Sequence, residues 1–216
     1  MAEPATLPLW VDLAAVGFGG LQGGVFAATG RDERNDFDIL GVAVFALVMG
    51  LGGGAIRDVM LGQVPAALRD DTYLLVAVAA GFAGMFLAHH VGRLRWSFDA
   101  LDALVVGLFV IVGALKTHDA GLPAGAIIVL GALTGVGGGV LRDILARRPV
   151  LLVQRSTPYA LVALAGAAAF VVLDTAGASR LIASAACLLV VVALRLLALT
   201  RGWRSPAPIV GARRRA

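Results

Sequence analysis

The sequence predicts an all-α protein that crosses a membrane seven times. Hydrophobic residues make up 59% of its 216 residues and charged residues only 15%, and the mean hydropathy is +0.90. A water-soluble domain of this length would expose more apolar surface than it could bury. A bilayer is crossed by a helix of ~20 apolar residues. Seven stretches fit this description, at residues 9–29, 39–61, 73–89, 98–116, 123–146, 158–173 and 181–199.

Short polar connections separate these stretches, which indicates one membrane domain over residues 1–216. The formal net charge is +4. Except for the terminal Arg213–Arg215, the basic residues are scattered singly or in pairs between apolar spans, so we expect no nucleic-acid partner. The single cysteine, Cys187, lies in an apolar stretch and cannot form a disulfide within the chain.

A motif in the second span recurs in the fifth. Residues 52–58 read Gly-Gly-Gly-Ala-Ile-Arg-Asp, and residues 137–143 read Gly-Gly-Gly-Val-Leu-Arg-Asp. The first and fourth spans match around their aspartates, and a Pro-then-Tyr pattern precedes the third and sixth. Three spans per unit place consecutive units in opposite orientations, which predicts an inverted repeat of three plus three helices with the seventh as an addition. The units are residues 7–91 and 97–175, the extra helix 179–200 and a basic cytoplasmic tail 201–216.

Three consecutive glycines weaken a membrane helix, because each costs ~1 kcal/mol relative to alanine and leaves its backbone uncovered. Irregular backbone inside a membrane persists where it lines a watery cavity, and paired broken helices are typical of transport sites. We therefore expect the second and fifth helices to be broken at the ion pathway. The alternative is that the glycines only let helices approach closely. The pathway glycines would be Gly52, Gly53, Gly54, Gly137, Gly138 and Gly139.

Charged side chains inside the spans are further candidates, because an ionisable group in a bilayer costs at least ~2.5 kcal/mol. Asp12 and Asp102 match across the repeat and are predicted to line the pathway, with helix capping near the interface as the alternative. Arg57 and Arg142 are expected near the far interface, where snorkelling is the alternative. Arg195 has no counterpart in the other half and is expected to snorkel.

The basic residues between spans predict the orientation, because cytoplasmic loops carry an excess of Lys and Arg. One side holds three of them, at Arg69, Lys116 and Arg180, and the other side holds twelve. This bias places the N-terminus outside and the C-terminus in the cytoplasm, as an odd number of spans requires. The twelve are Arg31, Arg34, Arg93, Arg95, Arg147, Arg148, Arg155, Arg201, Arg204, Arg213, Arg214 and Arg215.

The predicted orientation gives a reason for cation preference. The first half of the second helix would enter from the cytoplasm and the first half of the fifth from outside. If each half-helix ended at its glycines, two negative carbonyl ends would point into the membrane interior and favour a cation.

Signatures of catalysis are absent from the sequence. It contains no serine-protease constellation, metal-ligand spacing or dinucleotide fingerprint, and the glycine triplets lack the Gly-Lys-Ser/Thr of a phosphate loop. We expect no enzyme, no cofactor and no metal site.

The doubled glycine motif, the seven spans, the matched aspartates and Gly-Ala-Leu-Lys at residues 113–116 resemble the prokaryotic branch of the trimeric intracellular cation (TRIC) channel family. The resemblance covers about residues 7–200. It implies a homotrimer with one pore per subunit, lined by the first, second, fourth and fifth helices and kinked at the glycine triplets. It also implies passage of monovalent cations, chiefly potassium with sodium as a second candidate, contact with membrane lipids, and the inner membrane of a prokaryote.

The resemblance further implies a gating role for the basic residue of the fourth helix, here Lys116. The Arg-Asp pairs at Arg57–Asp58 and Arg142–Asp143 are expected to support the pore or its gating. The animal branch's Lys-Glu-Val signature is absent, which argues against phosphoinositide binding. A secondary transporter of a small solute such as an amino acid is the alternative to a channel, because inverted repeats with broken helices are common in that class.

Overall fold

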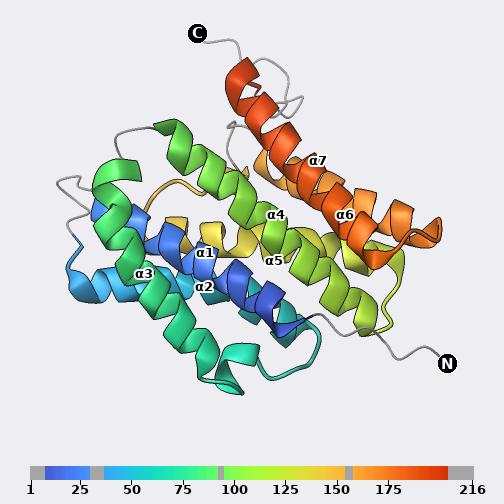
Figure 1. Ribbon diagram of the computed structural model, residues 1–216, viewed down its shortest axis with the longest axis horizontal. Coiled ribbons are helices and arrows are strands. Elements are labelled where there is room, and N and C mark those ends of the chain that lie inside the picture. Colours follow the sequence, from blue (N-terminus) through green and yellow to red (C-terminus); the bar gives the residue numbers. More distant parts are fainter. Residues whose placement is uncertain (1–7, 30–36, 92–94, 154–157, 204–216) are drawn as a thin grey trace, which may run out of the picture.

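The computed structural model describes residues 8–29, 37–91, 95–153 and 158–203, without the side chains of 89–91, 95–97 and 153. The described residues form seven α-helices and no strand (Figure 1). The predicted helices are confirmed, each boundary lying within three residues of its observed place. They are α1 (Leu9–Thr29), α2 (Ile39–Met60), α3 (Thr72–Val91), α4 (Arg95–Asp119), α5 (Ala124–Leu145), α6 (Tyr159–Thr175) and α7 (Arg180–Arg201), with short 3-10 helices η1 (Ala66–Leu68) after α2 and η2 (Leu151–Val153) after α5.

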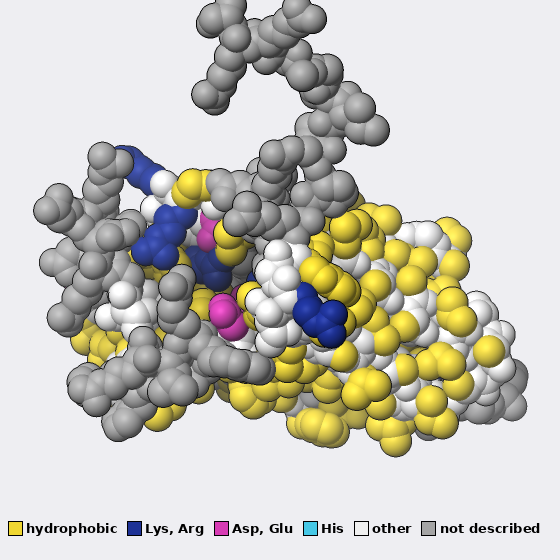
Figure 2. All heavy atoms as spheres, turned by 90° about the horizontal axis from the view of Figure 1, so that it is seen from above, with side chains coloured by type: hydrophobic (Ala, Val, Ile, Leu, Met, Phe, Trp, Pro, Cys, Tyr) yellow, Lys and Arg dark blue, Asp and Glu magenta, His cyan; other side chains and the backbone are white. Residues whose placement is uncertain are grey.

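Five of the described helices have the length and composition of membrane spans. These five, namely α1, α2, α5, α7 and residues Phe98–Asp119 of α4, are long and apolar enough to cross a bilayer, and α3 and α6 are shorter apolar helices. Large hydrophobic side chains are exposed on them, such as Leu75, Phe86 and Leu181, each at least 70% exposed. In Figure 2, hydrophobic side chains cover much of the described surface on the right of the view. Such a surface suits lipid rather than water.

Two groups of helices meet at the centre of the molecule. In Figure 1, α1 packs against α2 and α3 on one side, and α4 packs against α5 and α7 on the other. The groups are joined where α2 packs on α5 and α1 on α4. The largest hydrophobic cluster lies among α4, α5, α6 and α7 around Val110, Phe170 and Val191, and a second one around Phe26 and Phe45 joins α1 and α2.

The prediction that α2 and α5 are broken at their glycines was wrong, because both are continuous α-helix through the triplets. The close-approach alternative accounts for the first two glycines of each. A Cβ on Gly53 would fall well inside van der Waals distance of the Thr134 carbonyl oxygen, and one on Gly138 would lie 2.9 Å from the Met49 carbonyl oxygen. The two helices therefore cross backbone to backbone. Without free helix ends, the expected pair of converging carbonyl ends has no basis.

Several residues behind the predicted orientation lie outside the described residues. The described part includes Arg69, Lys116, Arg147, Arg148, Arg180 and Arg201. The side chain of Arg95 is outside it, as are Arg31, Arg34, Arg93, Arg155, Arg204, Arg213, Arg214 and Arg215, and with them most of the tail 201–216.

Candidate functional site

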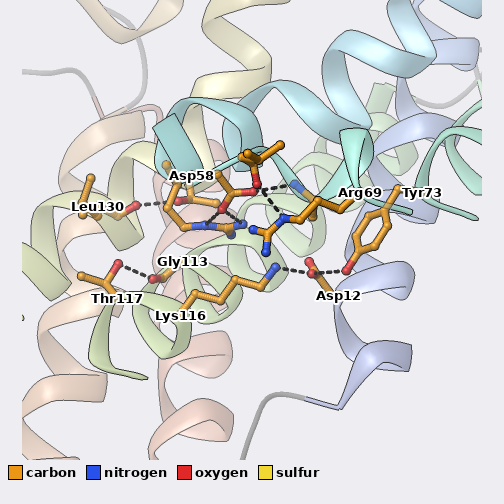
Figure 3. Close-up of polar contacts among 12 residues, drawn as sticks. Asp12, Asp58, Arg69, Tyr73, Gly113, Lys116, Thr117 and Leu130 are labelled. Atoms are coloured by element: carbon orange, nitrogen blue, oxygen red, sulfur yellow. Dashed lines mark hydrogen bonds and ion pairs between the residues drawn. The ribbon is translucent and has the colours of Figure 1, made fainter. Parts of the chain in front are cut away.

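A buried carboxylate joins three helices at one end of α4. Asp12, in the first turn of α1, accepts a hydrogen bond of 2.7 Å from the hydroxyl of Tyr73, the second residue of α3. It also forms an ion pair with Lys116 near the end of α4, and Figure 3 shows the lysine and the tyrosine reaching Asp12 from different helices. Asp12 is only 5% exposed, so it is not a solvent-facing cap. The Lys116 side chain is 25% exposed and closes the outer side of the contact.

A second buried carboxylate occupies the other end of α4. Asp102 accepts hydrogen bonds from Gln22 of α1 at 2.8 Å and from Tyr159 of α6 at 3.3 Å. Arg195 of α7 forms an ion pair with it at 3.1 Å and lies over the Tyr159 ring, 4.4 Å from the ring centre. Arg195 is 5% exposed. The expectation that it snorkels was wrong, because the guanidinium is buried against the Asp102 carboxylate.

Each Arg-Asp motif forms an ion pair at the end of its helix. The Arg57 guanidinium lies 2.6 Å from the Asp58 carboxylate, and the corresponding distance between Arg142 and Asp143 is 2.7 Å. The second oxygen of each carboxylate accepts the first backbone N–H of the 3-10 helix that follows, at 2.9 Å for η1 and 3.1 Å for η2. The arginines are 2% and 5% exposed, so the snorkelling alternative is wrong for both. The aspartates couple the arginines to the turns that leave α2 and α5.

The third glycine of each triplet faces side chains instead of the backbone of a neighbouring helix. A Cβ on Gly54 would meet only the Arg57 guanidinium, at 3.7 Å. A Cβ on Gly139 would lie 3.1 Å from the Tyr159 hydroxyl and 3.9 Å from the Arg142 guanidinium. In each triplet, the first two glycines therefore allow α2 and α5 to cross closely, and the third leaves space beside a buried arginine.

The two clusters correspond in all but one of these contacts. Each contains an aspartate near a helix start, a tyrosine that donates to it, and an Arg-Asp pair that holds the following 3-10 helix. In each cluster, the cation that pairs with the aspartate lies on the helix that follows the aspartate's three-helix unit. This cation is Lys116 on α4 for Asp12, and Arg195 on α7 for Asp102. One contact differs, because Gln22 reaches Asp102 whereas the matching residue on α4, Val112, is apolar.

Both clusters line hollows that are large enough for small solutes. Asp102 and Lys116 are 14 residues apart on α4, which corresponds to ~21 Å along the helix. The two hollows therefore lie at opposite ends of α4. The first vestibule, of about 460 Å³, is lined by Leu9, Asp58, Gln63, Ala66, Arg69, Asp70, Tyr73, Lys116, Asp119 and Ala120. The second, of about 470 Å³, is lined by Phe26, Phe98, Asp99, Asp102, Arg142, Asp143, Arg148, Pro149, Leu151 and Arg195.

The vestibules differ in charge. The first is lined by three acidic and two basic side chains, and the second by three of each. Hydrogen bonds from the side chain and then the backbone of Thr72 lower the pKa of the Asp70 carboxyl, so this carboxylate stays charged at the first mouth. Figure 2 shows the end at which α4 begins and α7 ends, where acidic and basic side chains gather in a hollow amid hydrophobic surface.

A small cavity adjoins the first vestibule, with which it shares Asp58, Ala66 and Tyr73. Its volume of about 20 Å³ has room for about one water molecule. Arg57 lines it, and the Nη1 of this side chain has no hydrogen-bond partner among the described residues. Among those residues, no group of three or more His, Cys, Asp or Glu side chains is arranged to hold a metal ion.

The helical arrangement, with buried charge clusters at both ends of its central helix, defines a polytopic membrane protein with the fold of prokaryotic TRIC channels. A TRIC cation channel structure superimposes with a TM-score of 0.80 at 26% identity, over 92% of this chain and 98% of the other. The TRIC orthologue from Rhodobacter sphaeroides gives a TM-score of 0.79 at 31% identity, over 90% and 97%. These neighbours confirm the resemblance that the sequence motifs predicted.

Sequence relatives give the family. A family model described as glycine transporter matches residues 9–89 and 99–175. A UPF0126 membrane protein of Deinococcus radiodurans is 35% identical over 162 residues, covering 74% of this chain and 73% of the relative. The UPF0126 inner membrane protein YadS of Escherichia coli is 32% identical over 74% and 75% of the two chains. The chain belongs to the family whose model is described as glycine transporter.

Sequence reasoning missed four members of the clusters, namely Gln22, Tyr73, Tyr159 and Arg195. The two tyrosines had a signal, because they match across the repeat, but spacing alone did not connect them to the aspartates. Gln22 and Arg195 have no match in the three-helix repeat. Arg195 becomes recognisable only when α7 is compared with α4.

Proposed function

We propose that the protein is a channel for monovalent cations, chiefly potassium with sodium also permeant. The observation that carries the proposal is the similarity to TRIC cation channels at 26% and 31% identity over at least 90% of both chains. The pathway would run from the first vestibule to the second along α1, α2, α4 and α5. The two aspartates of α1 and α4 and the six glycines of the triplets would line it, with the first two glycines of each triplet bringing α2 and α5 together beside it.

The charge clusters suggest how such a pathway selects and opens. Lys116 forms an ion pair with Asp12, and on this proposal the pair closes the first mouth. Movement of the ammonium group away from the carboxylate would leave Asp12 and the Tyr73 hydroxyl facing the pathway. A carboxylate attracts cations and excludes anions, and one carboxylate discriminates little between potassium and sodium. Lys116 is therefore proposed as the gating residue, while Arg57, Asp58, Arg142 and Asp143 support the walls of the pathway.

Planar-bilayer recording of the purified protein tests the channel. Under a potassium chloride gradient, the reversal potential should approach the potassium value and should hardly move when a bulky anion replaces chloride. Replacing both Asp12 and Asp102 by asparagine should lower the cation conductance by more than either single change. Asp71→Asn, at an aspartate that lines neither vestibule, should leave it unchanged. A reversal potential that follows chloride would refute cation selectivity.

A transporter of a small amino acid is the second candidate. It is favoured by the family model, which is described as glycine transporter, and by the equal numbers of acidic and basic side chains in the second vestibule. Such a vestibule can meet both ends of a zwitterion. Liposomes separate the candidates, because a transporter would show saturable uptake of labelled glycine with little unitary current. A channel would show unitary current with glycine uptake equal to that of empty liposomes.

The larger organisation is proposed on the same grounds. The matching contacts of the two clusters support an inverted repeat of residues 7–91 and 97–175 within a single domain, followed by helix 179–200 and a basic tail. A bend at the glycines without loss of helical hydrogen bonds remains a prediction. A homotrimer is supported by the Rhodobacter sphaeroides orthologue, which is described as trimeric. An inner-membrane location is supported by the name of YadS, and the basic loops support an outer N-terminus and a cytoplasmic C-terminus.

A further inference from the structure

The last helix, α7, contributes a buried cation, Arg195, to the cluster around Asp102. From the sequence, this helix was expected only as an addition to the repeat. Arg195 stands to Asp102 and Tyr159 as Lys116 stands to Asp12 and Tyr73. We infer that Arg195 is a second gating cation, so that two gates in series close the pathway at its two ends. This inference rests on the proposed function, because it assumes a pathway between the two vestibules.

The surroundings of Arg195 suit a gate that opens to water. Both Arg195 and Asp102 line the second vestibule, so their contact forms part of the wall of a hollow and is not sealed between helices on all sides. The guanidinium also rests on the Tyr159 ring. A buried ion pair has a high desolvation cost. Rotation of the arginine into the vestibule would return its charge to water while the tyrosine and Gln22 still donate to Asp102.

Tight packing begins immediately behind this contact. Val106 lies one helical turn beyond Asp102 on α4 and is 2% exposed. A Cβ on Gly135 of α5 would lie 2.5 Å from the Val110 side chain and 3.1 Å from the Val106 carbonyl oxygen. On the proposed pathway, Val106 is the first tightly packed residue that an ion would meet beyond the second mouth. The corresponding place behind the first mouth is Val16, one turn beyond Asp12, which lines the small cavity.

Cysteine accessibility tests the gate without any ion current. In a Cys187→Ser background, Val106→Cys reports opening at the Arg195 end and Val16→Cys reports opening at the Lys116 end. Purified protein in detergent exposes both ends to a small methanethiosulfonate reagent. Arg195→Gln should accelerate modification at residue 106 on the order of tenfold, which corresponds to ~1.4 kcal/mol for loss of a charged contact, and leave residue 16 unchanged. Lys116→Gln should give the reverse pattern.

Matched variants separate gating from damage. Arg201→Gln removes an exposed charge from the same helix and should change neither rate, and Arg195→Lys should keep residue 106 slow. If Arg195→Gln does not give a monodisperse protein, Asp102→Asn replaces it, because this change releases the arginine without removing it. The inference is overturned if residue 106 reacts at the parent rate in the released variant, or if both cysteines accelerate equally.

Single-channel recording adds a functional readout. Arg195→Gln should raise the open probability, and the double variant with Lys116→Gln should raise it by the product of the two single effects until saturation, as series gates require. A double variant no more open than Lys116→Gln alone would overturn the second gate. If the accessibility pattern appears but no variant passes cation current, the gates stand and the proposed cation channel fails.

Discussion

The glycine triplets allow a test in which adjacent residues have opposite expected effects. A Cβ on Gly53 would clash with the Thr134 carbonyl oxygen of α5, whereas a Cβ on Gly54 would meet only the Arg57 guanidinium, at an ordinary contact distance of 3.7 Å. Gly53→Ala should therefore force α2 and α5 apart, and Gly54→Ala should fit without displacement. If the triplets instead mark breaks that need flexible backbone, both substitutions should be equally harmful.

The magnitude follows from two terms. Alanine gains ~1 kcal/mol of helix propensity over glycine at either position, so this term cancels when the two variants are compared. Overpacking of a close helix contact costs ~1–3 kcal/mol, and this term applies only at Gly53. Gly138→Ala should fall between them, because its Cβ would lie 2.9 Å from the Met49 carbonyl oxygen and a shift of ~0.5 Å restores ordinary contact.

Thermal unfolding of the purified protein in detergent measures the difference. For a chain of this size, each kcal/mol corresponds to ~2–4 °C in Tm. Gly53→Ala should melt below Gly54→Ala by several degrees, and Gly54→Ala should melt at or above the parent. Equal melting temperatures for the two variants, or a lower one for Gly54→Ala, would refute the account of the helix crossing.

Three further predictions concern charge and orientation. Asp58→Asn should lower the free energy of unfolding by ~3–5 kcal/mol because it leaves the Arg57 guanidinium buried without a counter-ion, while Asp71→Asn should change it by less than ~0.5 kcal/mol; similar losses in chemical unfolding would contradict this. In a Cys187→Ser background, Ala120→Cys should react with an impermeant thiol reagent on intact cells and Arg147→Cys should not, and the reverse labelling would invert the orientation. Lys116→Gln should raise the open probability in bilayers, and an unchanged value would exclude a gating role.

The helices could be predicted from the sequence because hydrophobicity and length are local properties. A helix in lipid must satisfy its own backbone hydrogen bonds, so a run of ~20 apolar residues nearly determines its conformation. The glycines could not be resolved in the same way. Their cost to an isolated helix suggested a break, whereas the packing of α2 against α5 at Gly53 and Gly138 more than offsets that cost. Packing of this kind depends on two segments far apart in the chain.

The candidate site was predictable only as far as the repeat reached. Asp12, Asp102 and the two Arg-Asp pairs were selected because each has a match in the other half. Arg195 was missed because its match, Lys116, lies within the second unit and acts on the first. A direct comparison of α7 with α4 would have identified Arg195 as the counterpart of Lys116.

The same buried ion pairs bear both on the stability of the fold in a membrane and on the proposed preference for cations. Each cluster pairs two carboxylates with two cations, so its net charge is zero in the observed arrangement. Neutral pairs reduce the cost of placing charge at membrane depth. On the proposed mechanism, a gate opens when a long basic side chain leaves a short aspartate that the backbone and a tyrosine hold in place. The mobile partner of each pair is the cation, so opening exposes fixed negative charge and favours cations at both ends of the pathway.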